Sequence, residues 1–146
     1  LLLAAEKIDP VAPFLLLNGD TYFAAGLKIL AEFAAVNDAD WCFSLFRADE
    51  ERRYMGMEVS SQGQIISLQS GTGHPGRLAN GGVYWVHPRA LHDGEFSSGD
   101  TVSLEDNVFP AAMASGQRLF GIEFTGTFID IGVPDDYVRA SALLAV

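Results

Sequence analysis

The hydrophobic and polar residues of this chain form short apolar runs separated by polar turns, in an order that predicts an α/β fold. Residues 13–17 are entirely apolar, which is typical of a strand covered on both faces. Residues 23–36 follow with helical periodicity, and residues 41–46 form a second apolar run. This strand–helix–strand order favours a doubly wound, mostly parallel, Rossmann-like sheet.

The middle of the chain changes to a pattern that is typical of antiparallel strands. Residues 54–60 and 64–70 flank Ser61-Gln62-Gly63, so we expect a β-hairpin inserted in the sheet. The next segment is rich in Gly, Ser and Pro and predicts a loop. The other expected elements are a helix end at 1–8, a strand at 82–87, a short helix from Pro88, a helix at 104–115, strands at 118–124 and 127–132, and a helix from Pro134.

Composition and charge narrow the classes of function. With 146 residues, 49% hydrophobic and 19% charged, the chain reads as one globular domain. A net charge of −10 argues against nucleic acid as a partner, because no basic stripe is present to neutralise phosphates. No apolar run approaches the ~20 residues that span a bilayer, so no membrane is expected. The single cysteine, Cys42, suits a reducing compartment, and we expect a cytoplasmic protein.

Two acids stand at the ends of apolar segments. Asp20 follows the run FLLLNG, and Asp130 lies in FIDIG. Open α/β sheets bind ligands outside the carboxyl ends of their strands, and two carboxylates suit Mg²⁺, which completes its oxygen shell with phosphate and water. Asn-Gly-Asp is also good turn chemistry, so either acid alone can be a turn residue. As a pair, Asp20 and Asp130 predict a metal site, and we expect their carboxylates to meet.

Two further segments carry candidate residues. Consecutive Gly81 and Gly82 at the start of a strand allow close approach of a ligand, although a β-bulge has the same signature. Ser103 with Asp106 predicts a helix N-cap, and Glu105 between them is either a charge favoured by the helix dipole or a group that faces a ligand. The histidines show no metal-ligand spacing.

The order of four segments resembles a known family. FLLLNGDTYF, NGGVYWVHPRAL, SLEDNVFP and GTFIDIGVPDDYVRA are similar to motifs of the sugar-phosphate nucleotidyltransferases, in particular of the mannose-1-phosphate and heptose-1-phosphate guanylyltransferases. The resemblance spans residues 1–140. It implies transfer of a nucleotidyl group from a nucleoside triphosphate to a sugar 1-phosphate, which yields a nucleotide-sugar and pyrophosphate.

The resemblance also implies roles for single residues. Asp20 and Asp130 match the family's two ligands of the catalytic Mg²⁺. The Asn-Gly-Gly segment matches the lining of the sugar-phosphate pocket, and the acid of the Ser-Leu-Glu segment matches a residue that faces the sugar. The implied substrate-binding residues are Gly19, Asn80, Gly81, Gly82 and Glu105.

One departure from the family pattern concerns the nucleotide-binding segment. The family begins with a Gly-rich loop, G-G-x-G-(T/S)-R, and a Lys-Pro segment that bind the triphosphate, and nothing in this sequence matches them. We therefore expect residues 1–146 to form the C-terminal two-thirds of a single nucleotidyltransferase domain. Such a fragment is expected to be inactive alone and to associate with the missing N-terminal segment or as a homo-oligomer, because apolar surface is left open.

The second departure is a missing lysine. The family usually carries Glu-Lys after the second hairpin strand, where this chain has Leu68-Gln69-Ser70-Gly71. Arg77 is a candidate to supply the lost charge. The loss leaves open a catalytically inactive, sugar-phosphate-binding or regulatory paralogue. A metal-dependent glycosyltransferase fits less well, since such enzymes typically show Asp-x-Asp where this chain has Asn-Gly-Asp.

Overall fold

The computed structural model describes residues 11–49, 54–69, 76–91 and 100–144, together with four isolated residues, Ala4, Lys7, Asp9 and Phe96. The predicted helix end at residues 1–8 falls mostly outside these residues. The strands are β1 (Phe14–Leu17), β2 (Thr21–Phe23), β3 (Trp41–Arg47), β4 (Gly56–Val59), β5 (Ile65–Gln69), β6 (Leu78–Val86), β7 (Leu119–Glu123) and β8 (Phe128–Asp130). The helices are α2 (Leu27–Val36), the 3₁₀ turn η1 (Pro88–Leu91), the π turn η2 (Leu104–Val108), α3 (Phe109–Ala114) and α4 (Pro134–Leu143).

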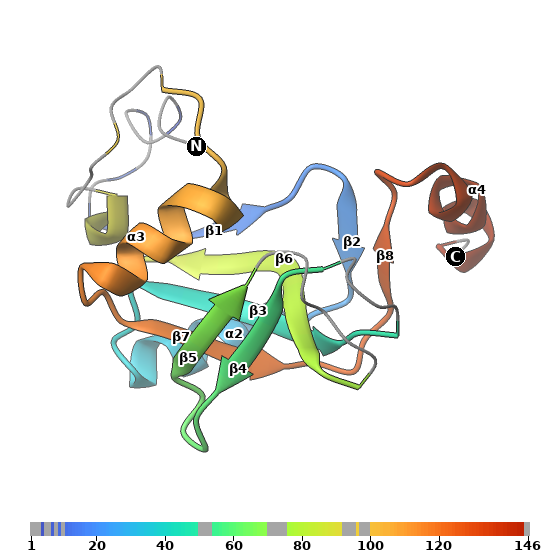
Figure 1. Cartoon of the computed structure of the whole chain (residues 1–146). Coiled ribbons are helices and arrows are strands. Elements are labelled where there is room, and N and C mark those ends of the chain that lie inside the picture. The colour runs from blue at the N-terminus through green and yellow to red at the C-terminus, as the bar shows by residue number, and fades with distance from the viewer. Residues whose placement is uncertain are drawn as a thin grey trace.

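The main sheet has the strand order β5-β4-β6-β3-β7, and β1 also pairs with β6 (Figure 1). The predicted α/β class and the inserted β4–β5 hairpin are confirmed. Strands β1, β3 and β7 run in the same direction, as the predicted parallel arrangement requires. However, β6 runs antiparallel between β1 and β3, so among the described strands only β3 and β7 form a directly paired parallel couple. Hydrophobic pattern does not reveal this reversal, because a strand buried on both faces reads the same in either direction.

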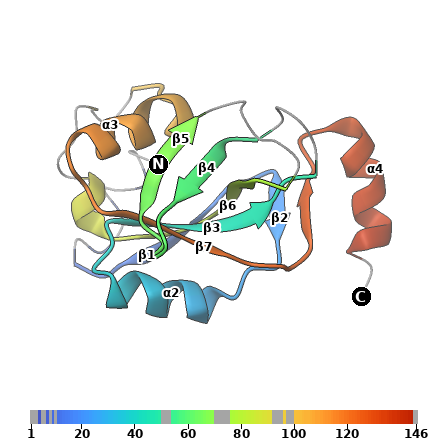
Figure 2. The same cartoon turned by 60° about the horizontal axis from the view of Figure 1, so that its bottom comes forward.

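Helices cover both faces of this sheet (Figure 2). Strand β3 is central, and six of its seven residues are buried. Its alternate residues Trp41, Phe43 and Leu45 pack in one hydrophobic cluster with Phe109 of α3. On the other face of the strand, Cys42 and Phe46 belong to a second cluster that includes Leu30 of α2. This two-sided burial explains why the sequence of β3 is a continuous apolar run rather than an alternating one.

Cys42 belongs to the second cluster and has no exposed surface. Burial raises the pKa of its thiol to about 12. The residue is therefore a small hydrophobic core residue rather than a nucleophile, as its apolar neighbours in the sequence indicate.

Strands β2 and β8 form a separate two-stranded antiparallel sheet beside the main one (Figure 1). Three residues are too few to show a period, which is why the sequence does not predict β2. Helix α4 begins at Pro134, as predicted, and continues from β8 at the side of the molecule (Figure 2). No helix of the described residues is both long and apolar enough for a transmembrane span.

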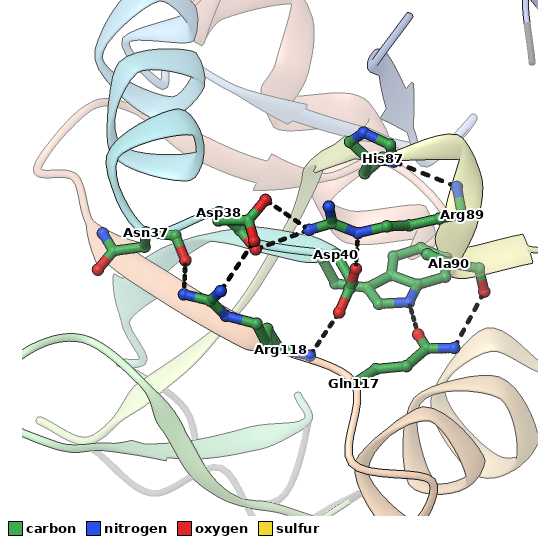
Figure 3. A network of polar contacts seen from close by, with 9 residues as sticks. Asn37, Asp38, Asp40, His87, Arg89, Ala90, Gln117 and Arg118 are labelled. Atoms are coloured by element: carbon green, nitrogen blue, oxygen red, sulfur yellow. Dashed lines mark hydrogen bonds and ion pairs between the residues drawn. The ribbon is translucent and has the colours of Figure 1, made fainter. Parts of the chain in front are cut away.

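A polar network closes the amino ends of β3 and β7 (Figure 3). The buried carboxylate of Asp40 accepts hydrogen bonds from Nε of Arg89 and, at 2.7 Å, from the backbone N–H of Arg118. Asp38 forms ion pairs with both guanidinium groups, at 2.9 Å and 2.8 Å. The hydrogen bond from Arg89 lowers the pKa of Asp38 below its ordinary value. These contacts join the α2–β3 turn, η1 and the start of β7.

We predict that Asp40→Ala lowers the free energy of unfolding by about 2 kcal/mol, because it leaves the Arg118 N–H and part of the Arg89 charge without an acceptor. Glu32→Ala is the matched control. It removes an exposed ion pair with Lys28 on α2 and is expected to cost less than about 0.5 kcal/mol. Urea unfolding of both variants measures the difference, and equal losses would contradict the role assigned to Asp40.

Candidate functional site

A cavity of about 260 Å³ gathers most of the predicted site residues. It lies where the β1–β2 turn, the residues just before β4, the bulged part of β6, η2 and β8 converge. Gly19 and Gly81, which the sequence also suggested, are not among its lining residues. The lining residues are Asn18, Asp20, Thr21, Tyr54, Met55, Asn80, Gly82, Glu105, Phe128 and Asp130.

Backbone pairing between β2 and β8 brings Asp20 and Asp130 together. Thr21 lies opposite Asp130 in this ladder, and the N–H of Ile131 donates to the carbonyl oxygen of Asp20 at 2.8 Å. Asp130 ends β8, as predicted. Asp20 lies in the turn between β1 and β2, three residues beyond the last residue of β1. The two acids therefore meet across the small sheet, and not along the carboxyl edge of the main sheet as the pattern suggested.

Distances from Gly132 limit how far apart the two carboxylates can lie. A Cβ atom placed on Gly132 would lie 3.1 Å from Oδ1 of Asp130 and 3.2 Å from Oδ2 of Asp20. The separation of these oxygens cannot exceed the sum of the two distances. Two carboxylates more than ~10 Å apart could not share one Mg²⁺ with bonds of ~2.1 Å, so the predicted proximity is confirmed.

The chemistry of this pair fits a hard cation. Mg²⁺ prefers oxygen ligands and is usually held by one or two carboxylates, with water and substrate phosphate completing its shell. The described residues contain no group of three or more His, Cys, Asp or Glu side chains that could hold a metal. Two carboxylates thus fit a cation shared with substrate and do not fit a closed structural site. That Asp20 and Asp130 bind Mg²⁺ stays a prediction.

Glu105 lines the same cavity from the π turn that precedes α3. Ser103 caps this turn as predicted, because its Oγ accepts from the N–H of Asp106 at 3.1 Å. The Oε1 of Glu105 accepts from Nδ2 of Asn80 at 3.0 Å. Burial raises the pKa of Glu105, and the hydrogen bond from Asn80 opposes this shift.

The two glycines after Asn80 form a bulge in β6. Phe43 of β3 pairs with Tyr84, whereas Leu45, two residues further along β3, pairs with Asn80, so β6 carries the extra residues. Gly82 has φ of +72°, and a Cβ there would lie 2.9 Å from Nδ2 of the Asn18 side chain. The sequence left open a bulge or a ligand approach at this point, and the structure shows a bulge that also lines the cavity.

Gly81 is required by packing instead. A Cβ on this residue would lie 2.5 Å from the ring of Phe23 and 2.9 Å from the carbonyl oxygen of Ser44. Both neighbours belong to the interior of the molecule. Gly81 therefore allows the small sheet to approach β6.

Several residues of the cavity wall were not predicted from the sequence. Phe128 lies two residues before Asp130 on β8 and therefore shares its face, a relation that strand alternation could have revealed. Tyr54 and Met55 precede β4, where no motif marked them. The remaining unassigned residues, Asn18 and Thr21, flank the Gly19-Asp20 pair.

The structure places Arg77 away from this cavity. Arg77 forms an ion pair with Glu58 at 3.8 Å and lines a different cavity along β4 and β5. Arg77 is therefore not among the residues that line the candidate site. A third cavity, of about 380 Å³, shares Tyr54 and Phe128 with the candidate site but contains none of the predicted residues. Its arginines are already paired, Arg47 with Glu123 at 2.8 Å and Arg139 with Asp136 at 2.7 Å.

Comparisons with known proteins identify the family of this chain. A family model described as nucleotidyl transferase matches residues 1–145. The mannose-1-phosphate guanylyltransferase of Mycobacterium tuberculosis is 32% identical over 127 residues, which cover 86% of this chain and 35% of the relative. The D-glycero-alpha-D-manno-heptose 1-phosphate guanylyltransferase of Campylobacter jejuni is 31% identical over 121 residues, which cover 83% of this chain and 51% of the relative. The chain thus spans about a third to a half of these relatives.

A solved structure has the same fold. HddC from Yersinia pseudotuberculosis superposes with a TM-score of 0.78 at 26% identity, covering 97% of this chain and 59% of HddC. The same protein complexed with GMP-PN gives a TM-score of 0.78 at 25% identity, with the same coverage.

We predict that Gly132→Ala weakens Mg²⁺ binding by about tenfold or more, because its methyl group would press against one oxygen of each carboxylate and displace them. Gly132 is not among the residues with positive φ, so its backbone tolerates alanine. Calorimetric titration with Mg²⁺ measures the effect. Gly19→Ala is the control, since its added methyl group meets no atom within 4 Å. Unchanged Mg²⁺ affinity in Gly132→Ala would argue against a shared cation.

Proposed function

The chain belongs to the nucleotidyl transferase family, and from this premise we propose that it serves the transfer of a nucleotidyl group from a nucleoside triphosphate to a sugar 1-phosphate. The products are a nucleotide-sugar and pyrophosphate. The observation that carries the proposal is the convergence of Asp20, Asp130 and Glu105 on one cavity. Two of these acids suit a cation shared with phosphates, and the third suits the hydroxyl groups of a sugar.

The relatives narrow the substrates that we propose. They are named as transferases of guanylyl groups to mannose 1-phosphate or to a manno-heptose 1-phosphate, and a structural neighbour is complexed with GMP-PN. We therefore propose GTP and a sugar 1-phosphate of manno configuration as the substrates.

The proposed reaction is an in-line displacement at phosphorus. A phosphate oxygen of the sugar 1-phosphate forms a bond to the α-phosphorus of the triphosphate. The bond between this phosphorus and the oxygen that bridges to the β-phosphate breaks, and pyrophosphate leaves with that oxygen. The protein has little covalent chemistry to perform, so catalysis rests on positioning two anions that repel each other.

In this proposal Asp20 and Asp130 would hold Mg²⁺. The ion supplies positive charge next to phosphate oxygens that carry negative charge in both substrates and in the transition state. The two aspartates position it, since the β2–β8 ladder fixes the backbone of both residues. Glu105 accepts hydrogen bonds from the sugar, and Gly82 borders the same substrate.

A non-catalytic sugar-phosphate-binding paralogue is the second candidate. The observation in its favour is the missing lysine, because Arg77, the candidate to supply its charge, does not line the candidate cavity. Pyrophosphate release on mixing the complete protein with GTP, mannose 1-phosphate and Mg²⁺ separates the two proposals. Release supports the transferase, and sugar-phosphate binding without release supports the paralogue.

We also propose that the chain is the C-terminal part of a single, longer nucleotidyltransferase domain that acts in the cytoplasm. Strand β1 supports this, because among the described strands it pairs only with β6, although its four residues are apolar. An unpaired apolar edge favours pairing with another strand. The occupant that we propose for it is a further segment of the same domain, with homo-oligomer formation as the alternative.

We predict that Asp130→Asn in the complete protein lowers kcat by about 10²–10³ while leaving the fold intact. The amide conserves shape but is a weaker ligand for a hard cation than a carboxylate. Stability without Mg²⁺ is expected to stay equal or rise, because the two aspartates repel each other in the absence of a cation. The measurements are kcat at saturating Mg²⁺ and thermal unfolding without Mg²⁺.

Two outcomes would contradict this assignment. Turnover close to that of the unmodified protein would refute the metal role of Asp130. A large loss of stability in the absence of metal would show that Asp130 is instead a structural residue at the end of β8.

A further inference from the structure

The side-chain amide of Asn80 is the centre of a hydrogen-bond network behind the cavity. Asn80 is 6% exposed. Its Nδ2 donates to the hydroxyl oxygen of Tyr84 at 2.8 Å and to Oε1 of Glu105 at 3.0 Å. Its Oδ1 accepts from the N–H of Gly82 at 3.2 Å. An amide nitrogen has two protons, so both are committed to protein groups.

This network allows one orientation of the amide. If oxygen and nitrogen were exchanged, the oxygen would face the carboxylate of Glu105, and two acceptors would stand opposite each other. The N–H of Gly82 would at the same time lose its acceptor. The amide of Asn80 is therefore a fixed hydrogen-bond donor towards Glu105.

The hydrogen bond from Asn80 fixes the position of the Glu105 carboxylate relative to β6, which is a separate element of the fold. Glu105 lies on η2, and the hydrogen bond joins it to β6 across 25 positions of sequence. A glutamate side chain loses considerable rotamer freedom when it is fixed in place. The bond from Asn80 holds Oε1, so Oε2 is presented in a defined direction.

We propose that Asn80 is a positioning residue, whose amide orients the carboxylate of Glu105 towards a sugar hydroxyl without binding the sugar itself. The inference rests on the proposed function, in which Glu105 accepts hydrogen bonds from the sugar 1-phosphate. It changes the role that the sequence suggested for Asn80, from direct substrate binding to support of the residue that binds.

The polar groups around Glu105 also support a positioning role for Asn80. The polar groups that act on it are Asn80 and Tyr84 on β6 and Asp106 on its own turn, and Asp20 and Asp130 line the same cavity. Burial and the charge of Asp106 raise the pKa of Glu105, and the hydrogen bond from Asn80 lowers it. Loss of the amide is thus expected to raise the pKa of Glu105 further.

The test is a steady-state analysis of Asn80→Asp in the complete protein, with mannose 1-phosphate, GTP and Mg²⁺. This substitution keeps the shape of the side chain and turns the donor into a second carboxylate. The KM for mannose 1-phosphate is expected to rise about 10- to 100-fold. The kcat and the KM for GTP are expected to change less than about threefold, because the lost contact is made equally in the ground state and the transition state.

Asn107→Asp is the matched control. It adds the same charge to the turn that carries Glu105, and its Oδ1 still accepts from the N–H of Ser103. The control is expected to leave the KM for mannose 1-phosphate within about twofold of that of the unmodified protein. An unchanged KM in Asn80→Asp, or equal changes in both variants, would overturn the inference.

A second measurement keeps the inference testable without turnover. The pKa of Glu105, followed by carboxyl-carbon NMR in Asn80→Ala, is expected to rise relative to the unmodified protein. An unchanged pKa in a folded Asn80→Ala variant would overturn the inference, whatever the activity. If the unmodified protein releases no pyrophosphate with any sugar 1-phosphate and triphosphate, the proposed function fails, and the NMR titration alone decides the role of Asn80.

Discussion

Backbone pairing between β2 and β8 holds two like charges together, and the candidate site depends on this constraint. Side chains do not draw Asp20 and Asp130 into proximity, since two carboxylates repel each other. At the largest separation of the two oxygens that the Gly132 distances permit, this repulsion is roughly 1 to 3 kcal/mol at an effective dielectric between that of water and that of a protein surface. The ladder from Thr21 to Asp130 and the Ile131 hydrogen bond must offset that cost. A cation between the acids would turn repulsion into attraction.

Aromatic packing between the small sheet and the main sheet stabilises the small sheet against this repulsion. Phe128 of β8 stacks on Phe46 of β3 with ring centroids 3.8 Å apart and an angle of 14°. Phe23 of β2 meets both rings edge-on, at 5.7 Å and 6.0 Å. Gly81 makes room for Phe23. The cluster places β2 and β8 in a fixed position relative to β6, and hence relative to Asn80 and Glu105.

The sequence predicted much of the fold, because most elements are long enough to show a period or have recognisable ends. The apolar run of β3, the hairpin and the Ser103 cap are examples. It also predicted that Asp20 and Asp130 would meet, although through the wrong sheet. The three-residue β2 shows no period, and the reversed direction of β6 leaves no mark in a strand that is buried on both faces. Tyr54 and Met55 line the cavity through tertiary contacts that local sequence does not encode.

The glycines and the acids of the motifs carry different information about function. Gly81 is fixed by the ring of Phe23, and Gly82 by its positive φ and the side chain of Asn18, so the fold alone would select for both. A paralogue without activity would therefore retain them. The pair of Asp20 and Asp130 is different, because its repulsion destabilises a fold that has no cation to bind. A chain freed from catalysis would have no need to keep two acids so close together, whereas this chain keeps both. Their retention therefore favours the transferase over the non-catalytic paralogue more strongly than the glycine motif does.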